Sequence, residues 1–168
     1  MKAIFLDIDG VLNNFSTDKQ TRSKSRCGAL IGIDKDKVKR LAKIIEKTNA
    51  ILILISSWKM GWEPKGNYTV DRFNSNYHAK YLDNHLKKKG KLVLTDKTKE
   101  RDPIYRGGGI QKYLASHPNI TSWIVLDDEI FIDYEEQKIY SHLIKVDPEY
   151  GLTDKDVENA IKLLNKKI

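Results

Sequence analysis

The sequence lacks most of the features that mark membrane-spanning, secreted or disulfide-linked proteins. Among its 168 residues Cys27 is the single cysteine, which excludes an intrachain disulfide and a zinc site made of several cysteines. No apolar run approaches the ~20 residues that are needed to cross a bilayer, and no long tract of proline, glycine or serine separates two domains. Because Met1 and Lys2 lead directly into the first apolar segment, we expect no signal peptide. We therefore expect one soluble domain in the cytoplasm, with no membrane partner.

Positive charge is what the sequence has in excess. Thirty lysines and arginines against 23 acidic residues leave a formal net charge of +7, which favours anionic partners such as phosphorylated substrates, nucleic acid or acidic surfaces. Scattered lysines also serve solubility alone. Four cations form a basic segment in a polar stretch of eight residues: Lys19, Arg22, Lys24 and Arg26. This basic segment is interpreted either as a substrate-facing loop or as a solvated flap.

Apolar segments of strand length alternate with segments of helical periodicity along the chain. Strands are expected at about 4–6, 50–55, 92–94, 123–126 and 139–146. Helices are expected at about 34–49, 77–90, 107–116 and from 153 onward. This alternation implies right-handed crossovers and a mostly parallel sheet. We expect a single α/β domain over residues 1–168, with a short loop insert at about 13–33 and an irregular insert at about 58–90.

Two carboxylates, Asp7 and Asp9, follow the first expected strand, and Gly10 comes directly after them. Two unit charges 4 Å apart in a partly screened site repel each other by ~4 kcal/mol. A hard cation such as Mg²⁺ is the natural partner for such a pair, and the glycine allows a sharp turn beside it. A solvated turn that closes an ordinary strand is the alternative interpretation.

Three of the expected strands end in small polar or acidic residues. They are followed by Asp7 and Asp9, by Ser56 and Ser57, and by Asp127 and Asp128. In a parallel sheet the carboxyl ends of the strands lie on one edge, where open α/β sheets bind their ligands. These residues are therefore expected to converge on one site, although they are distant in sequence.

These motifs resemble those of the haloacid dehalogenase (HAD) superfamily, whose members are mostly Mg²⁺-dependent phosphatases and phosphotransferases. The first motif, Asp-x-Asp-Gly after a buried strand, is matched at 5–12, the second, a serine that ends the next strand, at 53–56, and the fourth, an acidic pair, at 124–128. The order and spacing agree over residues 4–128, and Gly151-Leu152-Thr153 before the last helix also fits. The resemblance implies a three-layer Rossmann-like HAD fold, in which helices flank a mostly parallel five-stranded sheet.

The third HAD motif is normally a lysine, sometimes an arginine, near the start of the helix before the fourth strand. Arg106 fits this position best, and Lys112 is the alternative. The glycines at 107–109 also suggest a nest that cradles phosphate. By the resemblance, the basic residue stabilises charge on the substrate phosphate, and Ser56, or Ser57 in its place, donates a hydrogen bond to a phosphoryl oxygen.

The resemblance also implies roles for the four acids. Asp7 is the nucleophile that forms an aspartyl-phosphate and contacts the metal, and Asp9 is the general acid and base whose backbone carbonyl contacts the metal. Asp128 is expected to bind Mg²⁺ directly, whereas Asp127 holds the basic residue or a metal-bound water. The reverse assignment of Asp127 and Asp128 remains open.

Residues 58–75 show no clear periodicity but are rich in aromatic side chains. Trp58, Trp62, Tyr68 and Phe73 are interleaved with cations, and they are interpreted either as a stacking platform for bases or, preferably, as a small core that fastens a long loop. The segment is too irregular for an independent cap domain.

Because both inserts are small, the site is expected to stay open to a phosphate on a bulky chain. The layout resembles the small HAD domains that are associated with nucleic-acid end repair and remove terminal phosphates, which agrees with the excess positive charge. A phosphoprotein or a small phosphorylated metabolite is an alternative substrate, and a catalytically silent HAD-like module that binds nucleic acid or protein is the alternative function. The sequence sets neither the oligomeric state nor the segment that closes the site.

Overall fold

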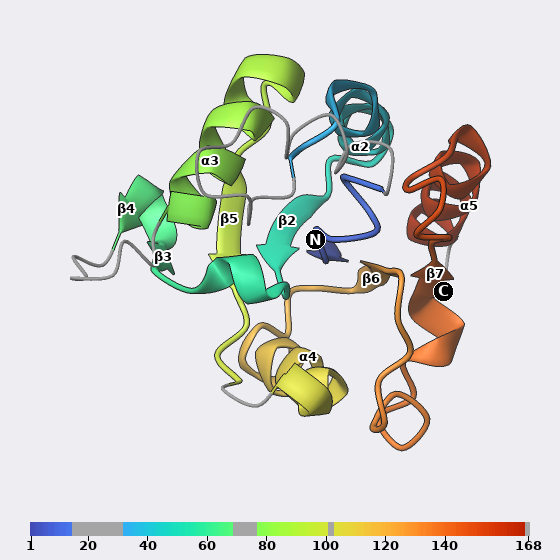
Figure 1. Cartoon of the computed structure of the whole chain (residues 1–168). Coiled ribbons are helices and arrows are strands. Elements are labelled where there is room, and N and C mark those ends of the chain that lie inside the picture. The colour runs from blue at the N-terminus through green and yellow to red at the C-terminus, as the bar shows by residue number, and fades with distance from the viewer. Residues whose placement is uncertain (15–31, 69–76, 101–102, 167–168) are drawn as a thin grey trace.

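A five-stranded parallel sheet forms the centre of the protein (Figure 1). The computed structural model describes residues 1–14, 32–68, 77–100 and 103–166. The strands lie in the order β5-β2-β1-β6-β7, and every neighbouring pair is parallel. Their bounds are β1 Lys2–Leu6, β2 Ile51–Leu54, β5 Leu94–Lys97, β6 Ser122–Asp127 and β7 Leu143–Lys145. β1 therefore occupies the middle of the sheet, as its uninterrupted apolar sequence predicts.

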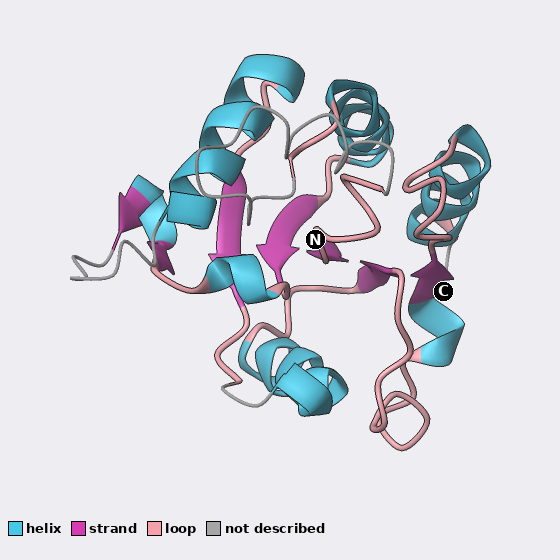
Figure 2. Cartoon of the chain, viewed as in Figure 1, coloured by secondary structure: helices cyan, strands magenta, loops and turns pink. Residues whose placement is uncertain are grey.

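Helices cover both faces of the sheet, which gives the expected three-layer arrangement (Figure 2). The described α-helices are α2 (Lys35–Thr48), α3 (Tyr77–His85), α4 (Arg106–Ser116) and α5 (Asp154–Asn165). In Figure 1, α2, α3 and α5 lie on one side of the sheet and α4 lies on the other. Successive side chains of β1 join the two resulting cores: Ile4 and Leu6 belong to the first, and Ala3 and Phe5 to the core beneath α4. No helix in the described ranges is both long and apolar enough to span a bilayer.

α2 begins and ends, and α5 begins, where the capping signals of the sequence predict. The side chain of Asp34 accepts hydrogen bonds from two N–H groups in the first turn of α2, and Asn49 ends that helix in the left-handed conformation, at φ 54°. Thr153 begins α5 through a capping box with Asp156. These local signals fix two helices that pack against each other on one face of the sheet.

The strand β5 begins two residues later than the sequence suggests. After α3 the chain continues as a π-helix, η3 (Leu86–Gly90), and Lys91 then adopts a left-handed conformation at φ 53°. The N–H of Leu92 still donates to the carbonyl of Leu86, so this residue closes the helix and is not available to the sheet. Pairing with β2 therefore starts at Leu94.

The last strand is also shorter than expected. Lys138 has a left-handed backbone at φ 55°, and Tyr140–His142 form a 3₁₀ helix, η5, so the extended conformation starts at Leu143. Ile139, which we expected at the start of the strand, is fully buried in the core beneath α4 instead.

The segment between β2 and β5 holds several short elements. They are the 3₁₀ helix η1 (Ser57–Lys59), the antiparallel pair β3 (Trp62–Glu63) and β4 (Asn67–Tyr68) with η2 (Pro64–Gly66) between them, and then α3 and η3. Trp58 and Trp62 are buried in the same core as Ile4 and Leu6. Their burial agrees with the interpretation as a core and excludes an exposed stacking platform for these two rings. Phe73 and the basic segment lie outside the described residues.

Candidate active site

The acids that follow β1 and β6 lie side by side at the carboxyl edge of the sheet. The two strands are neighbours with Leu6 opposite Leu126, and the N–H of Asp7 donates to the carbonyl of Leu126 at 2.9 Å. One carboxylate oxygen from each of Asp7, Asp127 and Asp128 lies within 4.8 Å of the other two. We call these three residues the acidic cluster. Carboxylate oxygens at this spacing are a suitable donor set for a hard divalent cation.

Arg106, the first residue of α4, joins two members of the acidic cluster. Its NH1 atom lies 3.0 Å from Oδ1 of Asp7 and 2.7 Å from Oδ2 of Asp127. The guanidinium also lies over the ring of Phe131, 4.0 Å from the ring centroid. Burial alone would lower the pKa of Arg106, but the two carboxylates raise it above its ordinary value, so this side chain stays charged.

Burial and crowded negative charge raise the pKa of two acids in the cluster. For Asp7 burial is the largest cause, and Asp127, Asp9 and Asp128 add to it, while Arg106 opposes them; the pKa still lies well above the ordinary value. The pKa of Asp128 rises to about 6, first through burial and then through the charges of its sequence neighbours Asp127 and Glu129. A bound divalent cation would relieve this repulsion.

Asp127 is fully buried, and both of its carboxylate oxygens accept hydrogen bonds. Oδ2 accepts from the hydroxyl of Tyr134 at 2.8 Å as well as from Arg106, and Oδ1 accepts from the N–H of Glu129 at 3.1 Å. Burial and the neighbouring charge of Asp127 raise the pKa of Tyr134, so its hydroxyl remains a donor. The sequence did not predict Tyr134 as part of this site, because residues 128–139 have neither strand nor helix periodicity.

Asp9 is half-buried, and donors hold it from two sides. Its Oδ1 accepts from Nδ2 of Asn13 and its Oδ2 from Nε1 of Trp58, each at 2.9 Å. Gly10, next to it, has φ +71°, and a Cβ atom built there would lie 2.3 Å from Oδ2 of Asp128. The glycine therefore provides both the turn after Asp9 and the space for the second acidic strand end.

Ser56 lies on the same edge, one strand away from Asp7. The N–H of Ile55 donates to the carbonyl of Leu6 at 3.0 Å, which keeps the chain beside β1 just before this serine. Ser56 is buried, and its Oγ accepts from the N–H of Trp58 at 3.4 Å as the cap of η1. Ser57, the alternative, is exposed.

Comparison with known proteins agrees with this arrangement. Residues 3–157 match the family described as the HAD domain in Swiss Army Knife RNA repair proteins. The chain belongs to this HAD family. Searches of curated proteins and of solved structures gave no significant match. The family supports a hydrolase of the HAD type, and the acidic cluster supplies residues that could bind the divalent metal such domains generally use.

The glycine run of the HAD domain does not form an open phosphate nest. The N–H groups of Gly107 and Gly108 donate to the two carboxylate oxygens of Asp133, at 3.1 and 2.7 Å. Asp133 is buried, so the protein itself supplies the anion at the start of α4. The expectation that these glycines cradle phosphate is therefore wrong for Gly107 and Gly108.

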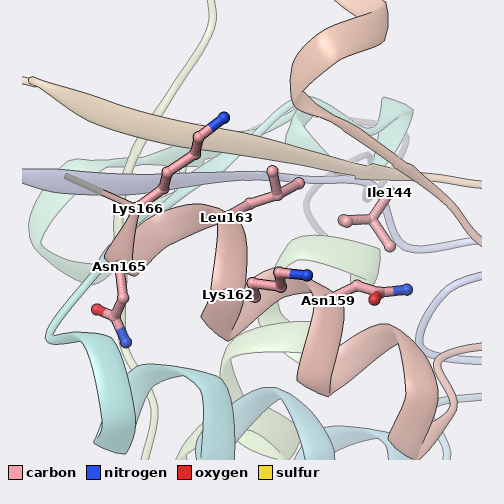
Figure 3. Close-up of a pocket in the computed structure, with 6 residues that line it drawn as sticks. All are labelled: Ile144, Asn159, Lys162, Leu163, Asn165 and Lys166. Carbon is pink, nitrogen blue, oxygen red and sulfur yellow. The ribbon is translucent and has the colours of Figure 1, made fainter. Parts of the chain in front are cut away.

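Two cavities of the HAD domain lie beside helices α4 and α5, and neither is lined by a member of the acidic cluster. Lys112, the alternative basic residue, is exposed and lines one of about 300 Å³ beside Asp96, Lys99 and Tyr113. It is therefore Arg106 that contacts Asp7. The second cavity, of about 660 Å³, lies mainly along α5 (Figure 3). Its lining residues are Ile144, Asn159, Lys162, Leu163, Asn165 and Lys166, and no member of the acidic cluster is among them.

Proposed function

We propose that this HAD domain is a Mg²⁺-dependent phosphatase that removes terminal phosphates from RNA or another bulky phosphorylated substrate through an aspartyl-phosphate. The observation that carries the proposal is the acidic cluster with Arg106 between Asp7 and Asp127. Such a group combines a nucleophile, a cation site and a fixed positive charge within a few ångströms, as transfer of a phosphoryl group requires.

The donor set of the acidic cluster fits a divalent metal ion. Its members are all oxygen donors, and burial together with their mutual repulsion raises the pKa of Asp7 and Asp128. The side chains of Asp7 and Asp128 and the backbone carbonyl of Asp9 would hold the ion. When bound, Mg²⁺ would offset the negative charges of the nucleophile and the substrate phosphate. Asp127, whose oxygens already accept three hydrogen bonds, would keep Arg106 in place instead.

The reaction itself would use Asp7 and Asp9. A carboxylate oxygen of Asp7 attacks phosphorus, a new P–O bond forms, and the bond to the leaving oxygen breaks while Asp9 donates a proton to that oxygen. Asp9 then takes a proton from a water molecule that attacks the aspartyl-phosphate. Inorganic phosphate leaves, and Asp7 returns to its free carboxylate.

Arg106 and Ser56 would hold the substrate phosphate. One nitrogen of the guanidinium faces Asp7 and Asp127, and the remaining N–H donors of an arginine suit the oxygens of a phosphoryl group. Ser56 lies on the neighbouring strand end with its backbone fixed by η1. Its hydroxyl would donate to one phosphoryl oxygen.

RNA is the substrate class that the remaining observations support. The family is named for RNA repair proteins, and the net charge of +7 favours a polyanion, because phosphate contacts supply much of the affinity for nucleic acid. We therefore expect an end of the RNA strand, where a phosphate monoester is accessible, to enter the site.

The test measures phosphate release from oligoribonucleotides that carry a 3′- or 5′-terminal phosphate, with Mg²⁺ and with a chelator. We expect release by the wild type with Mg²⁺, loss of release with the chelator, and no release by Asp7→Asn. The control is Asp36→Asn, which changes an exposed carboxylate of α2. No release from either RNA or from an aryl phosphate by the wild type, or equal release by Asp7→Asn, would point to a silent binding module instead.

A further inference from the structure

The carboxylate of Asp9 accepts one hydrogen bond on each oxygen, from donors that belong to different segments. Asn13 donates through Nδ2 to Oδ1, and Trp58 donates through Nε1 to Oδ2. We infer that Trp58 and Asn13 are positioning residues that orient Asp9 for proton transfer to and from the substrate. This inference rests on the proposed phosphatase function, because it concerns the acid and base of that reaction.

The orientation of the Asn13 amide follows from its other contact. Oδ1 of Asn13 accepts from the backbone N–H of Gly10 at 2.8 Å, and a backbone N–H can only donate. The amide NH₂ group must therefore face Asp9. Asn13 is also buried, so its amide has little freedom to rotate away. The turn at Gly10 therefore also fixes the Asn13 amide that donates to the Asp9 side chain.

The indole of Trp58 is held by the segment that follows β2. The ring packs edge-on against His78 at 5.0 Å between centroids and lies 6.4 Å from the ring of Tyr81, both of α3. The backbone N–H of Trp58 is fixed at Oγ of Ser56. The short helix η1 therefore links Ser56, which is proposed to bind phosphate, with the indole that donates to Asp9. Helix α3 packs against η1.

These two donors suit a proton-transfer group because neither can act as a base. An indole N–H and an amide NH₂ have no basic lone pair at neutral pH, so they fix a carboxylate without competing for its proton. Each carboxylate oxygen offers two lone-pair positions, and one hydrogen bond on each leaves a position for the substrate. The side chain of Asp9 also stays outside the acidic cluster. The hydrogen bonds from Trp58 and Asn13 therefore fix the orientation of the Asp9 carboxylate and leave lone-pair positions at which it can exchange a proton with the substrate.

The chain supplies a matched control for the Trp58 contact. Trp62 lies in the same insert, is buried in the same core, and donates its indole N–H to the carboxylate of Asp83 at 3.2 and 3.1 Å. Asp83 belongs to α3 and not to the proposed reaction. Trp62→Phe and Trp58→Phe therefore remove the same kind of hydrogen bond from similar surroundings.

The experiment compares two leaving groups through kcat/KM, which reports the steps up to release of the leaving group. The alkoxide of a 3′-phosphorylated oligoribonucleotide needs a proton as it leaves, whereas the nitrophenolate of 4-nitrophenyl phosphate does not. Trp58→Phe should lose about tenfold or more with the RNA but less than about threefold with 4-nitrophenyl phosphate. Trp62→Phe should keep the wild-type ratio between the two substrates. Asn13→Ala should show the same selective loss as Trp58→Phe, and it tests the inference even if Trp58→Phe does not fold.

The outcomes separate this inference from the proposed function. Equal losses with both substrates in Trp58→Phe and Asn13→Ala, or the same selective loss in Trp62→Phe, would overturn the positioning role while wild-type turnover left the phosphatase intact. A wild type that turns over neither substrate would overturn both.

Discussion

The two acidic strand ends of this HAD domain look alike in sequence but differ in their surroundings. In each of them the inner acid, Asp7 or Asp127, is buried against Arg106, and the outer acid, Asp9 or Asp128, is half-buried. N–H donors hold both oxygens of Asp9, whereas burial, followed by the charges of Asp127 and Glu129, raises the pKa of Asp128 to about 6. Hydrogen-bond donors therefore fix the orientation of one outer carboxylate, whereas burial and nearby negative charge favour a proton or a cation at the other.

The largest effect should separate the two inner acids. Asp7→Asn removes the proposed nucleophile and should lower kcat by about 10³-fold or more. Asp127→Asn keeps the nucleophile and weakens only its support through Arg106, so a loss of roughly 10–100-fold is expected. Acid-quenched reactions with ³²P-labelled substrate should show phosphoprotein for Asp127→Asn and none for Asp7→Asn. Equal labelling of the two variants would contradict the assignment.

A large effect on stability should follow from replacing Arg106, whose charged guanidinium contacts both inner acids. Arg106→Met leaves two buried carboxylates without their partner, so the free energy of unfolding should fall by about 3–5 kcal/mol in metal-free buffer. Lys112→Met is the control on the same helix; it is exposed, and its change should stay within about 0.5 kcal/mol. Urea denaturation measures both. Similar midpoints for the two variants would show that Arg106 does not stabilise the acidic cluster.

The two outer acids should differ in their response to Mg²⁺. At about 100 times its dissociation constant, Mg²⁺ should stabilise the wild type by about 2.7 kcal/mol, which is a rise of roughly 5–10 °C in Tm for a chain of this length. Asp128→Asn should lose most of this rise. Asp9→Asn should keep it, because Asp9 is expected to bind the ion through its backbone carbonyl. Scanning calorimetry that gave the opposite pattern would exchange the roles of the two residues.

The smallest effect concerns pH, and it tests the crowding around Asp128. Because Mg²⁺ needs the ionised carboxylate, a proton should compete with it below a pH of about 6, where the pKa of Asp128 lies. The apparent Mg²⁺ affinity should then fall by about tenfold per pH unit for this one carboxyl. Titration calorimetry between about pH 5 and 7.5 measures this.

A neighbouring variant sharpens the pH test. Glu129 is one of the charges that raise the pKa of Asp128, so Glu129→Gln should move the midpoint to lower pH. In the metal-free protein, acidification should instead have a favourable effect. The folded state binds the proton of Asp128 more tightly than the unfolded chain does, so lowering the pH from about 6 towards 3.8 should raise the contribution of this group to the free energy of unfolding. An unchanged midpoint in Glu129→Gln would contradict the electrostatic explanation.

Local signals explain why much of the fold could be predicted from the sequence. The apolar run of β1, the caps at Asp34 and Thr153 and the acidic pair after β6 each act within a few residues, so each is visible in the chain itself. The placement of Arg106 beside Asp7 also agrees with its position at the start of α4. By contrast, the left-handed turn that delays the start of β5 lies at Lys91 and not at the preceding Gly90, so the residue types did not predict its position.

The parts of the site that could not be predicted are contacts between distant segments. Trp58 reaches Asp9 across 49 positions of sequence, and Asp133 meets the glycine run from a loop without periodicity. Tyr134 reaches Asp127 from that same loop. In each case the sequence shows the residue but not its partner, because long-range packing determines which polar groups meet.

Gly10 shows how a residue without any side chain can constrain the active site. An alanine there would place its methyl carbon 2.3 Å from the Asp128 carboxylate, so the two acidic strand ends would have to move apart. A substitution that removes no reactive group would then displace the Asp128 side chain from its place in the acidic cluster. Because the Asp128 side chain fills the space beside Gly10, no larger residue fits there without a shift, and any redesign that enlarges the turn after Asp9 meets the same limit.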